Sequence, residues 1–340
     1  MHEVMQTKVG LRHLAVCAVA AAAALAFGME RAPAQATEPL VLEAKIPLGD
    51  VKGRIDHMAF DPTRNRLFVA ELVNRTVGVV DLSARRKAHV IPDLAEPQGI
   101  GYVAAGDTLY VASAGDGSVR VYRAADYAQT DRLDLGEDAD NVRVDAAGKR
   151  VFVGYGDGAL AIIDPATHKK TADIAVGAHP EGFRLARSGR VFVNLPKRHE
   201  IAVVDPASGK QIAAWPMHAA ENFPMTLDEE SERVIVAFRS PAALGVFSMH
   251  DGASVANVPT CGDSDDVFVD AKRHRVYVSC GEGFLDVFDV RGDTYSRTAH
   301  MPTAAGARTA LFSAEADRLF LAVPARAEQP AAIWVYRPAP

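Results

Sequence analysis

One sequence pattern recurs seven times along this chain of 340 residues, at intervals of 40 to 43 residues. Each copy contains a strand-like run, a turn rich in glycine or polar residues, and a second strand-like run, as in "TLYVASAGDGSVRVY" (Thr108–Tyr122). One bulky residue marks the same place in the first run of every copy, and we call these residues the anchors. They are Phe68, Tyr110, Phe152, Phe192, Ile235, Tyr277 and Phe320. Self-similarity at this period indicates that the chain folds as seven copies of one unit.

Each copy has room for four strands. In the third copy, "VRVD" (Val142–Asp145) precedes the anchor strand, and "KKTADIAV" (Lys169–Val176) follows the second strand. Short β-type runs with turn signals every 8–12 residues or so, and no helical period, indicate an all-β protein. A single small sheet cannot bury both of its faces, whereas units stacked around an axis cover one another. The sequence therefore predicts an all-β, seven-bladed β-propeller with four-stranded blades of about 42 residues.

The two ends of the repeat region are complementary. After "IWVY" (Ile333–Tyr336) the last copy has no fourth strand, whereas an unassigned strand-like run, "LVLEAKIPL" (Leu40–Leu48), precedes the first copy. An unpaired strand edge in an open ring would invite association. We therefore expect the N-terminal strand to pair with the C-terminal blade and to close the ring.

The first 36 residues have the layout of a secretory signal peptide. Lys8 and Arg12 precede an apolar run (Leu14–Met29), and small residues follow at Ala34 and Ala36. We expect cleavage after Ala36, which leaves residues 37–340 as a single propeller domain that is periplasmic or secreted. No second hydrophobic segment follows, so no membrane span is expected in the mature chain.

The net charge bears on the class of partner. The full chain has a formal charge of −6, and removal of three basic and two acidic residues by cleavage makes it −7. An acidic chain without a basic tract argues against nucleic acid as a partner. The partner is instead expected to be a protein, a peptide or a small molecule, and we expect the propeller itself to be a monomer.

Two cysteines, Cys261 and Cys280, remain in the mature chain. In an oxidising compartment such a pair favours a disulfide over a metal site. The predicted hairpin of the sixth copy sets Asp265 opposite Cys280, so Cys261 needs only a short bend of its loop to reach Cys280. We therefore expect a Cys261–Cys280 disulfide.

Several short runs point to a family. They are "LYVAS", "VFVGY", "VFVNL" and "VYVSC", their partners "VVD", "IID" and "VFD", and the turns "DPATHK" and "DPASGK". Together they resemble the YVTN-repeat, YncE-like family of exported seven-bladed propellers, over nearly the whole mature chain. The namesake motif is degenerate here, and "VFVN" (Val191–Asn194) is its closest copy. The resemblance implies the fold and export, but no particular activity, because propellers carry unrelated functions.

Alignment of the copies on their anchors brings one set of polar residues into register at the start of the innermost strand. This position is occupied by Asp56, Gln98, Asp140, Glu181, Phe223, Asp265 and Arg308. The next position includes His57, Asn141 and Asp266, and Asn222, His179 and His218 lie in neighbouring loops. Innermost strands line the central channel, so we expect these side chains to converge on one channel mouth. The candidate ligand-binding residues are Asp56, His57, Gln98, Asp140, Asn141, Glu181, Asn222, Asp265, Asp266 and Arg308.

Two interpretations of this set stay open at the level of sequence. The acids are either the polar lining of a wet channel, with Arg308 offsetting part of their charge, or a site for a cation or a cationic ligand. A metal would be held by Asp56, Asp140, Glu181 and Asp265. Oxygen ligands suit Ca²⁺, and added imidazoles would suit Zn²⁺.

Three functions are compatible with these residues. The first is an exported binding or scaffold propeller that presents the channel mouth to a ligand. The second is a metal-dependent hydrolase similar to propeller lactonases, which place a divalent cation among channel carboxylates. The third, a quinone-dependent redox subunit, lacks a haem motif or cysteine-rich site to support it. The sequence has no nucleophile elbow, zinc-protease motif or phosphate loop, which favours the binding protein.

Overall fold

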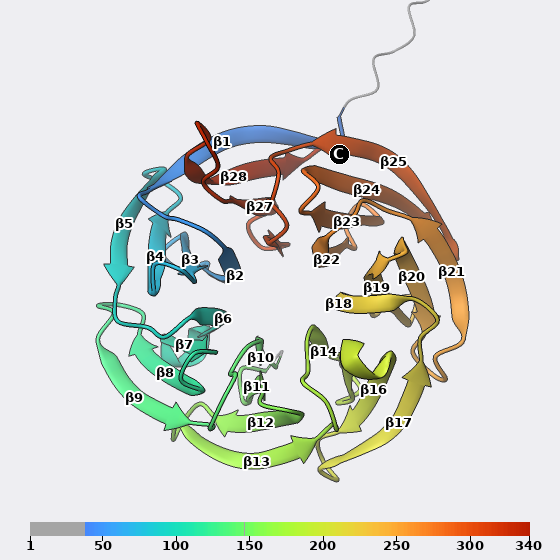
Figure 1. The fold of residues 1–340 in the computed structure, drawn as a ribbon, viewed down its shortest axis with the longest axis horizontal. Coiled ribbons are helices and arrows are strands. Elements are labelled where there is room, and N and C mark those ends of the chain that lie inside the picture. The colour runs from blue at the N-terminus through green and yellow to red at the C-terminus, as the bar shows by residue number, and fades with distance from the viewer. Residues whose placement is uncertain (1–37, 146) are drawn as a thin grey trace, which may run out of the picture. The chain divides into compact units, whose positions relative to one another are not determined.

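The computed structural model describes residues 38–145 and 147–340, and it confirms the predicted fold. Seven antiparallel sheets of four strands are arranged in a ring (Figure 1). Helical structure in the described ranges is limited to the short 3₁₀ turns Ala104–Gly106 and Pro196–Arg198. None of the helices among these residues is long and apolar enough to cross a membrane. The predicted signal peptide and its cleavage after Ala36 lie outside the described residues.

The first four blades follow one another along the chain. Blade one comprises β2 (Ile55–Asp61), β3 (Arg66–Glu71), β4 (Thr76–Asp81) and β5 (Arg86–Ile91). Blade two comprises β6 (Pro97–Val103), β7 (Thr108–Ser113), β8 (Ser118–Arg123) and β9 (Gln129–Asp134). Blade three comprises β10 (Val142–Val144), β11 (Val151–Tyr155), β12 (Ala159–Asp164) and β13 (Lys169–Ala175). Blade four comprises β14 (Phe183–Leu185), β15 (Val191–Leu195), β16 (Glu200–Asp205) and β17 (Lys210–Pro216).

The last three blades complete the ring. Blade five comprises β18 (Ala220–Asp228), β19 (Arg233–Ser240), β20 (Ala242–Ser248) and β21 (Ser254–Pro259). Blade six comprises β22 (Ser264–Asp270), β23 (Arg275–Cys280), β24 (Phe284–Arg291) and β25 (Thr294–Pro302). Blade seven comprises β26 (Ala310–Ser313), β27 (Arg318–Val323), β28 (Ala331–Pro338) and the N-terminal strand β1 (Leu40–Gly49). The first strand of each blade is the innermost one, as Figure 1 shows for β2, β6, β10, β14, β18 and β22.

The N-terminal strand closes the ring as predicted. β1 pairs antiparallel with β28, with Ile46 opposite Ile333, and the Ala339 amide donates to the Pro39 carbonyl over 2.9 Å. Leu40, Ile46 and Leu48 are at most 1% exposed and belong to the cores on the two sides of blade seven. The closure is therefore an integral part of the hydrophobic core.

The anchors explain why the sequence repeats. All seven are at most 1% exposed. Phe68 of blade one packs with Ile100 and Leu109 of blade two, and Phe152 of blade three packs with Val191 and Val193 of blade four. Each anchor thus fills the space between two blades, and seven equivalent gaps require seven equivalent bulky residues.

The predicted disulfide is present. Cys261 and Cys280 are bonded, with their Cα atoms 5.9 Å apart. The predicted register was wrong by one residue, because Ser264 pairs with Cys280 and Asp266 pairs with Ser279. Asp265 occupies the irregularity between those pairs, and such an extra residue bends a strand and redirects its side chain.

We expect reduction of this disulfide to destabilise the protein. The bond closes a loop with a sequence separation of 19. On the loop-entropy model, opening a loop of this size costs about 3 kcal/mol of unfolding free energy. Urea denaturation of the oxidised and the reduced protein measures the difference. Superimposable transitions would contradict the prediction.

Candidate functional site

The predicted channel-mouth residues occupy irregular backbone at the start of the innermost strands. Register shifts interrupt the pairing of β2, β6, β18 and β22 beside Asp56, Gln98, Phe223 and Asp265. In blades three and four the inner strands begin only after Asp140 and Glu181. These side chains therefore escape the strict alternation of a regular strand. One cavity is lined by six of the ten predicted residues: His57, Asp140, Asn141, Glu181, Asp265 and Asp266.

The remaining four predicted residues lie outside this cavity lining. Asp56 is buried, with its side chain only 1% exposed, and Asn222 is completely buried. The Asn222 amide donates to the Asn194 side chain and the Glu200 carbonyl, so it has a structural role. Arg308 lines a neighbouring cavity together with Arg54 and Asp263.

Arg54 is the nearest charged neighbour of Asp56. Its guanidinium lies 2.7 Å from the Asp56 carboxylate and 3.4 Å from the Gln98 side-chain oxygen. Arg54 belongs to the loop before β2, two residues ahead of Asp56, and the prediction from sequence did not include it. Because its carboxylate already holds a guanidinium, Asp56 is a poor metal ligand.

Two arginines neutralise Asp265. Arg239 donates to Asp265 Oδ1 over 2.6 Å, and Arg308 lies 3.3 Å from Asp265 Oδ2. Arg239 also stacks its guanidinium 4.2 Å from the centre of the Phe223 ring. Phe223 therefore supports the arginine that neutralises Asp265. Of the four predicted metal ligands, only Asp140 and Glu181 have no arginine ion pair within the described part of the chain.

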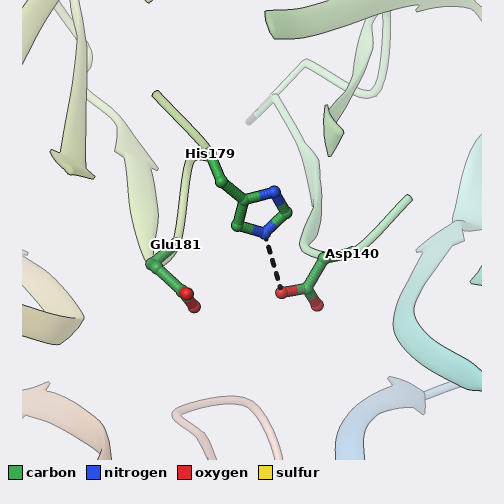
Figure 2. Close-up of side chains that lie close together, drawn as sticks. All are labelled: Asp140, His179 and Glu181. Carbon is green, nitrogen blue, oxygen red and sulfur yellow. Dashed lines mark ion pairs between the residues drawn. The ribbon is translucent and has the colours of Figure 1, made fainter. Parts of the chain in front are cut away.

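Asp140 and Glu181 are joined by His179, a loop residue between β13 and β14. One potential ligand atom from each of the three side chains lies within 4.8 Å of the other two. Figure 2 shows the three side chains gathered around a common space, with His179 directed at Asp140. The Asp140 and His179 side chains are 9% and 10% exposed. Asp140 Oδ1 is buried and has no hydrogen-bond partner among the described residues.

Backbone contacts orient two of these groups. His179 Nδ1 lies 2.7 Å from the Gly156 carbonyl oxygen and donates to it, which leaves Nε2 facing Asp140. A backbone carbonyl behind an imidazole is the usual way in which metal-binding histidines are oriented. Gly99 of blade two lies directly against the Asp140 backbone carbonyl, where any side chain would collide. Gly99 thus allows Asp140 to approach the neighbouring blade.

Protons compete with a cation for this cluster. Burial and the Asp140 carboxylate raise the pKa of Glu181 to about 7. Burial opposes a charge on His179, but Asp140 and the Gly156 carbonyl outweigh it and raise the pKa of His179 to about 9. In the absence of a cation, these shifts mean that protons relieve the repulsion between the two carboxylates.

The neighbouring acids and histidine are also perturbed. Burial, followed by repulsion from Arg143, lowers the pKa of His57 to about 4, so this imidazole is neutral at pH 7. Burial and the adjacent Asp265 carboxylate raise the pKa of Asp266 to about 7. The Asp266 carboxylate accepts a hydrogen bond of 2.8 Å from the Ala310 amide. These two residues line the cavity but are not part of the three-residue cluster.

The shifted pKa of Asp56 should make the free energy of unfolding depend on pH. Burial raises the pKa of Asp56 to about 8 from 3.8, despite the favourable charge of Arg54. The folded state therefore holds a proton that the unfolded state has released, and this group makes stability fall as pH rises from 4 to 8. In EDTA, the Asp56→Asn variant should gain stability relative to wild type over this window, by up to about tenfold in folding equilibrium per pH unit. Asp157→Asn, on an exposed turn, is the control. Parallel stability profiles for wild type and Asp56→Asn would contradict the assignment.

Comparison with known proteins supports the fold of this chain and no particular activity. No family model matches this chain, and no curated protein matches it. It is similar to the structure titled Kuenenia stuttgartiensis hydrazine synthase, with a TM-score of 0.69 and 16% identity over 80% of this chain and 94% of that one. It is also similar to the RRP9 WD40 repeats, with a TM-score of 0.76 and 11% identity over 89% and 98% of the two chains. U3-55K has a TM-score of 0.75 and 11% identity over 89% and 99%. At these identities the likeness carries no activity or ligand across, and the chain is an all-β, seven-bladed propeller that shares its fold with these three structures.

Proposed function

We propose that this chain is an exported binding propeller of the YVTN-repeat type, and that it holds a divalent transition-metal ion at the channel mouth as part of its ligand site. The signal-peptide layout and the internal disulfide support export. One observation carries the metal: Asp140, His179 and Glu181 each offer one potential ligand atom to a common space, and these atoms lie within 4.8 Å of one another.

The donor set selects the class of metal. One imidazole and two carboxylates suit Zn²⁺ better than Ca²⁺, which prefers six to eight oxygen ligands. Ligand atoms around a tetrahedral zinc lie roughly 3.4 Å apart. The three donors, within 4.8 Å of one another, would therefore need only a small inward movement. Open coordination positions would then face the channel, where a ligand with an oxygen or nitrogen donor binds.

Metal titration tests this proposal. Mature protein stripped with EDTA should bind one Zn²⁺ per chain and show a rise in melting temperature, with a weaker response to Ca²⁺. The Asp140→Asn variant should lose at least about 100-fold in zinc affinity, because a neutral amide replaces a charged ligand. Isothermal titration calorimetry measures both the stoichiometry and the affinity.

Two control variants sharpen this test. Asp265→Asn should leave zinc affinity within a few-fold of wild type, because Arg239 and Arg308 occupy Asp265. Asp157→Asn should also behave like wild type. Equal losses in Asp140→Asn and Asp265→Asn would favour the wider set of four channel carboxylates, and equal zinc binding by all variants would overturn the site.

A metal-dependent hydrolase of the propeller lactonase type is the second candidate. The observation that favours it is that the described residues supply three protein donors to this cluster, since catalytic metal sites keep positions open for water and substrate. Zinc-loaded protein should then hydrolyse simple lactones, and Asp140→Asn should abolish turnover while Asp157→Asn retains it. Zinc binding without turnover on a lactone panel would leave the binding protein as the function.

A further inference from the structure

A second layer of aligned residues lies deeper in the channel. In every blade the anchor pairs with one residue of the innermost strand, and these partners form a ring at one level. They are Ala59, Gly101, Arg143, Arg184, Thr226, Phe268 and Leu311. Only two members of this layer are charged. Both are arginines, and they belong to the neighbouring blades three and four.

These two arginines have no acidic partner. Within residues 38–145 and 147–340, no carboxylate lies within 4.0 Å of either guanidinium. Arg143 donates to the Val142 carbonyl and the Asn141 side chain, each over 2.8 Å. Arg184 donates to the Phe183 carbonyl over 3.1 Å. A guanidinium has five N–H donors, so both side chains keep donors for a ligand.

The arginines separate two parts of the channel. Together with His57 and Asp266 they line two cavities. One is the cavity at the channel mouth that Asp140 and Glu181 also line, and the other is a second cavity with a volume of about 350 Å³. The second cavity is otherwise mainly apolar. Its apolar walls include Met58, Ile100, Val142, Val144, Phe268 and Leu311. The second cavity thus combines two arginines at its edge with an apolar interior, which is the pattern of a site for a small organic molecule.

The surrounding acids compensate the two arginines only in part, through Asp266 and, for Arg143, Asp140. Burial, followed by repulsion from Arg143, lowers the pKa of Arg184 to about 9, and burial also lowers the pKa of Arg143. His57 is neutral at pH 7, and Asp266, whose pKa is about 7, is only partly charged there. Two neighbouring cations in a partly buried site are costly unless an anion joins them.

We propose that Arg143 and Arg184 bind the headgroup of an amphiphilic organic anion, a carboxylate or a phosphate monoester, whose apolar body occupies the second cavity. Two guanidiniums on the innermost strands of neighbouring blades can donate paired hydrogen bonds to the oxygens of either headgroup. The apolar body is required because the walls beyond the arginines offer few hydrogen-bonding groups. The second cavity is separate from the proposed metal ligands, because none of Asp140, His179 and Glu181 lines it.

Binding of simple probes in the presence of EDTA tests the proposal. Octanoate or octyl phosphate should bind mature protein with one site per chain, and the tighter of the two identifies the headgroup. Octanamide, which has the same apolar body without charge, and inorganic phosphate, which has charge without the body, should each bind at least about tenfold more weakly. Isothermal titration calorimetry and thermal melts provide two independent readouts.

Variants locate the binding site. Arg184→Gln should weaken octanoate or octyl phosphate binding by at least about tenfold and leave the ligand-free protein as stable as wild type, because it removes a partly buried charge without an ion-pair partner among the described residues. Arg143→Gln should weaken binding similarly. Arg123→Gln is the matched control, since Arg123 is a surface arginine with its side chain 54% exposed. The proposal is overturned if neither amphiphile binds, if octanamide or inorganic phosphate binds as tightly, or if Arg184→Gln and Arg123→Gln bind alike. Because the assays contain EDTA, failure of the zinc site would not change these results.

Discussion

Deletion of residues 38–49, which removes β1, should abolish the stable folded monomer. The strand contributes Leu40, Ile46 and Leu48 to the cores of blade seven, and each is at most 1% exposed. Loss of three such side chains costs roughly 6–9 kcal/mol, which is comparable with the whole stability of a typical protein. The deletion also exposes the edge of β28, including Ile333 and Trp334, to other chains. Size-exclusion chromatography and thermal denaturation of the deleted and the intact mature protein measure both effects.

Point substitutions within β1 separate burial from strand pairing. Ile46→Ala should cost about 2–4 kcal/mol. Val41→Ala should cost less than about 1 kcal/mol, because Val41 is 37% exposed although it pairs with Arg337 in the same strand. A deletion variant that stays monomeric with an unchanged melting temperature would show that β1 does not close the ring in solution.

Asp286→Ala should produce the second-largest loss. The Asp286 side chain is completely buried, and Oδ2 accepts hydrogen bonds from Thr260 Oγ1 over 2.9 Å and from the Cys261 amide over 2.8 Å. His300 and Arg297 also contact this carboxylate, at 2.6 Å and 3.1 Å. Removing the carboxylate leaves buried donors without an acceptor, so we expect a loss of about 4 kcal/mol of unfolding free energy.

Asp289→Ala is the matched control for Asp286→Ala. Asp289 lies on the same strand, β24, but its side chain is 36% exposed and is 3.3 Å from Arg275. An ion pair of this kind contributes at most about 1 kcal/mol. Urea denaturation should therefore separate the two variants by several kcal/mol. Similar midpoints for both would mean that the buried network does not stabilise blade six.

The fold was predictable because every repeat contains the bulky residue that packing between two blades requires. A bulky anchor must fill each of seven equivalent gaps between blades, so the spacing of Phe68, Tyr110 and their counterparts reports the number of blades directly. The last repeat lacks a fourth strand, and this gap identified Leu40–Leu48 as the strand that closes the ring. The predicted register around Cys280 failed by one residue because the bulge at Asp265 leaves no sign in an alternating pattern.

The site was only partly predictable, because the repeat pattern does not show which acids have an arginine partner. The alignment brought Asp56, Asp140, Glu181 and Asp265 together as equivalent acids, but Arg54 and Arg239 distinguish them in space. Arg54 lies only two residues before Asp56, so this pairing was open to a closer reading of the sequence. Arg239 lies on a strand of another blade, and no spacing rule connects it to Asp265. That pairing could be found only from the folded ring.

The arginine layer, by contrast, carried a sequence signal. Arg143 and Arg184 each occupy the inner-strand position three residues after the aligned acid, where the other blades have uncharged residues. An alignment extended along the innermost strand would have brought both into the channel.

The pairing of β1 with β28 also has a consequence for how the polypeptide acquires its structure. Six blades consist of strands that are consecutive in the chain, so each can form from local segments as soon as they are available. Blade seven is different, because its outer strand is synthesised first and its partner almost last. Contacts between such distant segments form slowly, because a long loop must close before they provide any stabilisation. During vectorial synthesis the growing chain would therefore remain an open arc with two exposed edges, and the native ring would be a property of the completed chain alone.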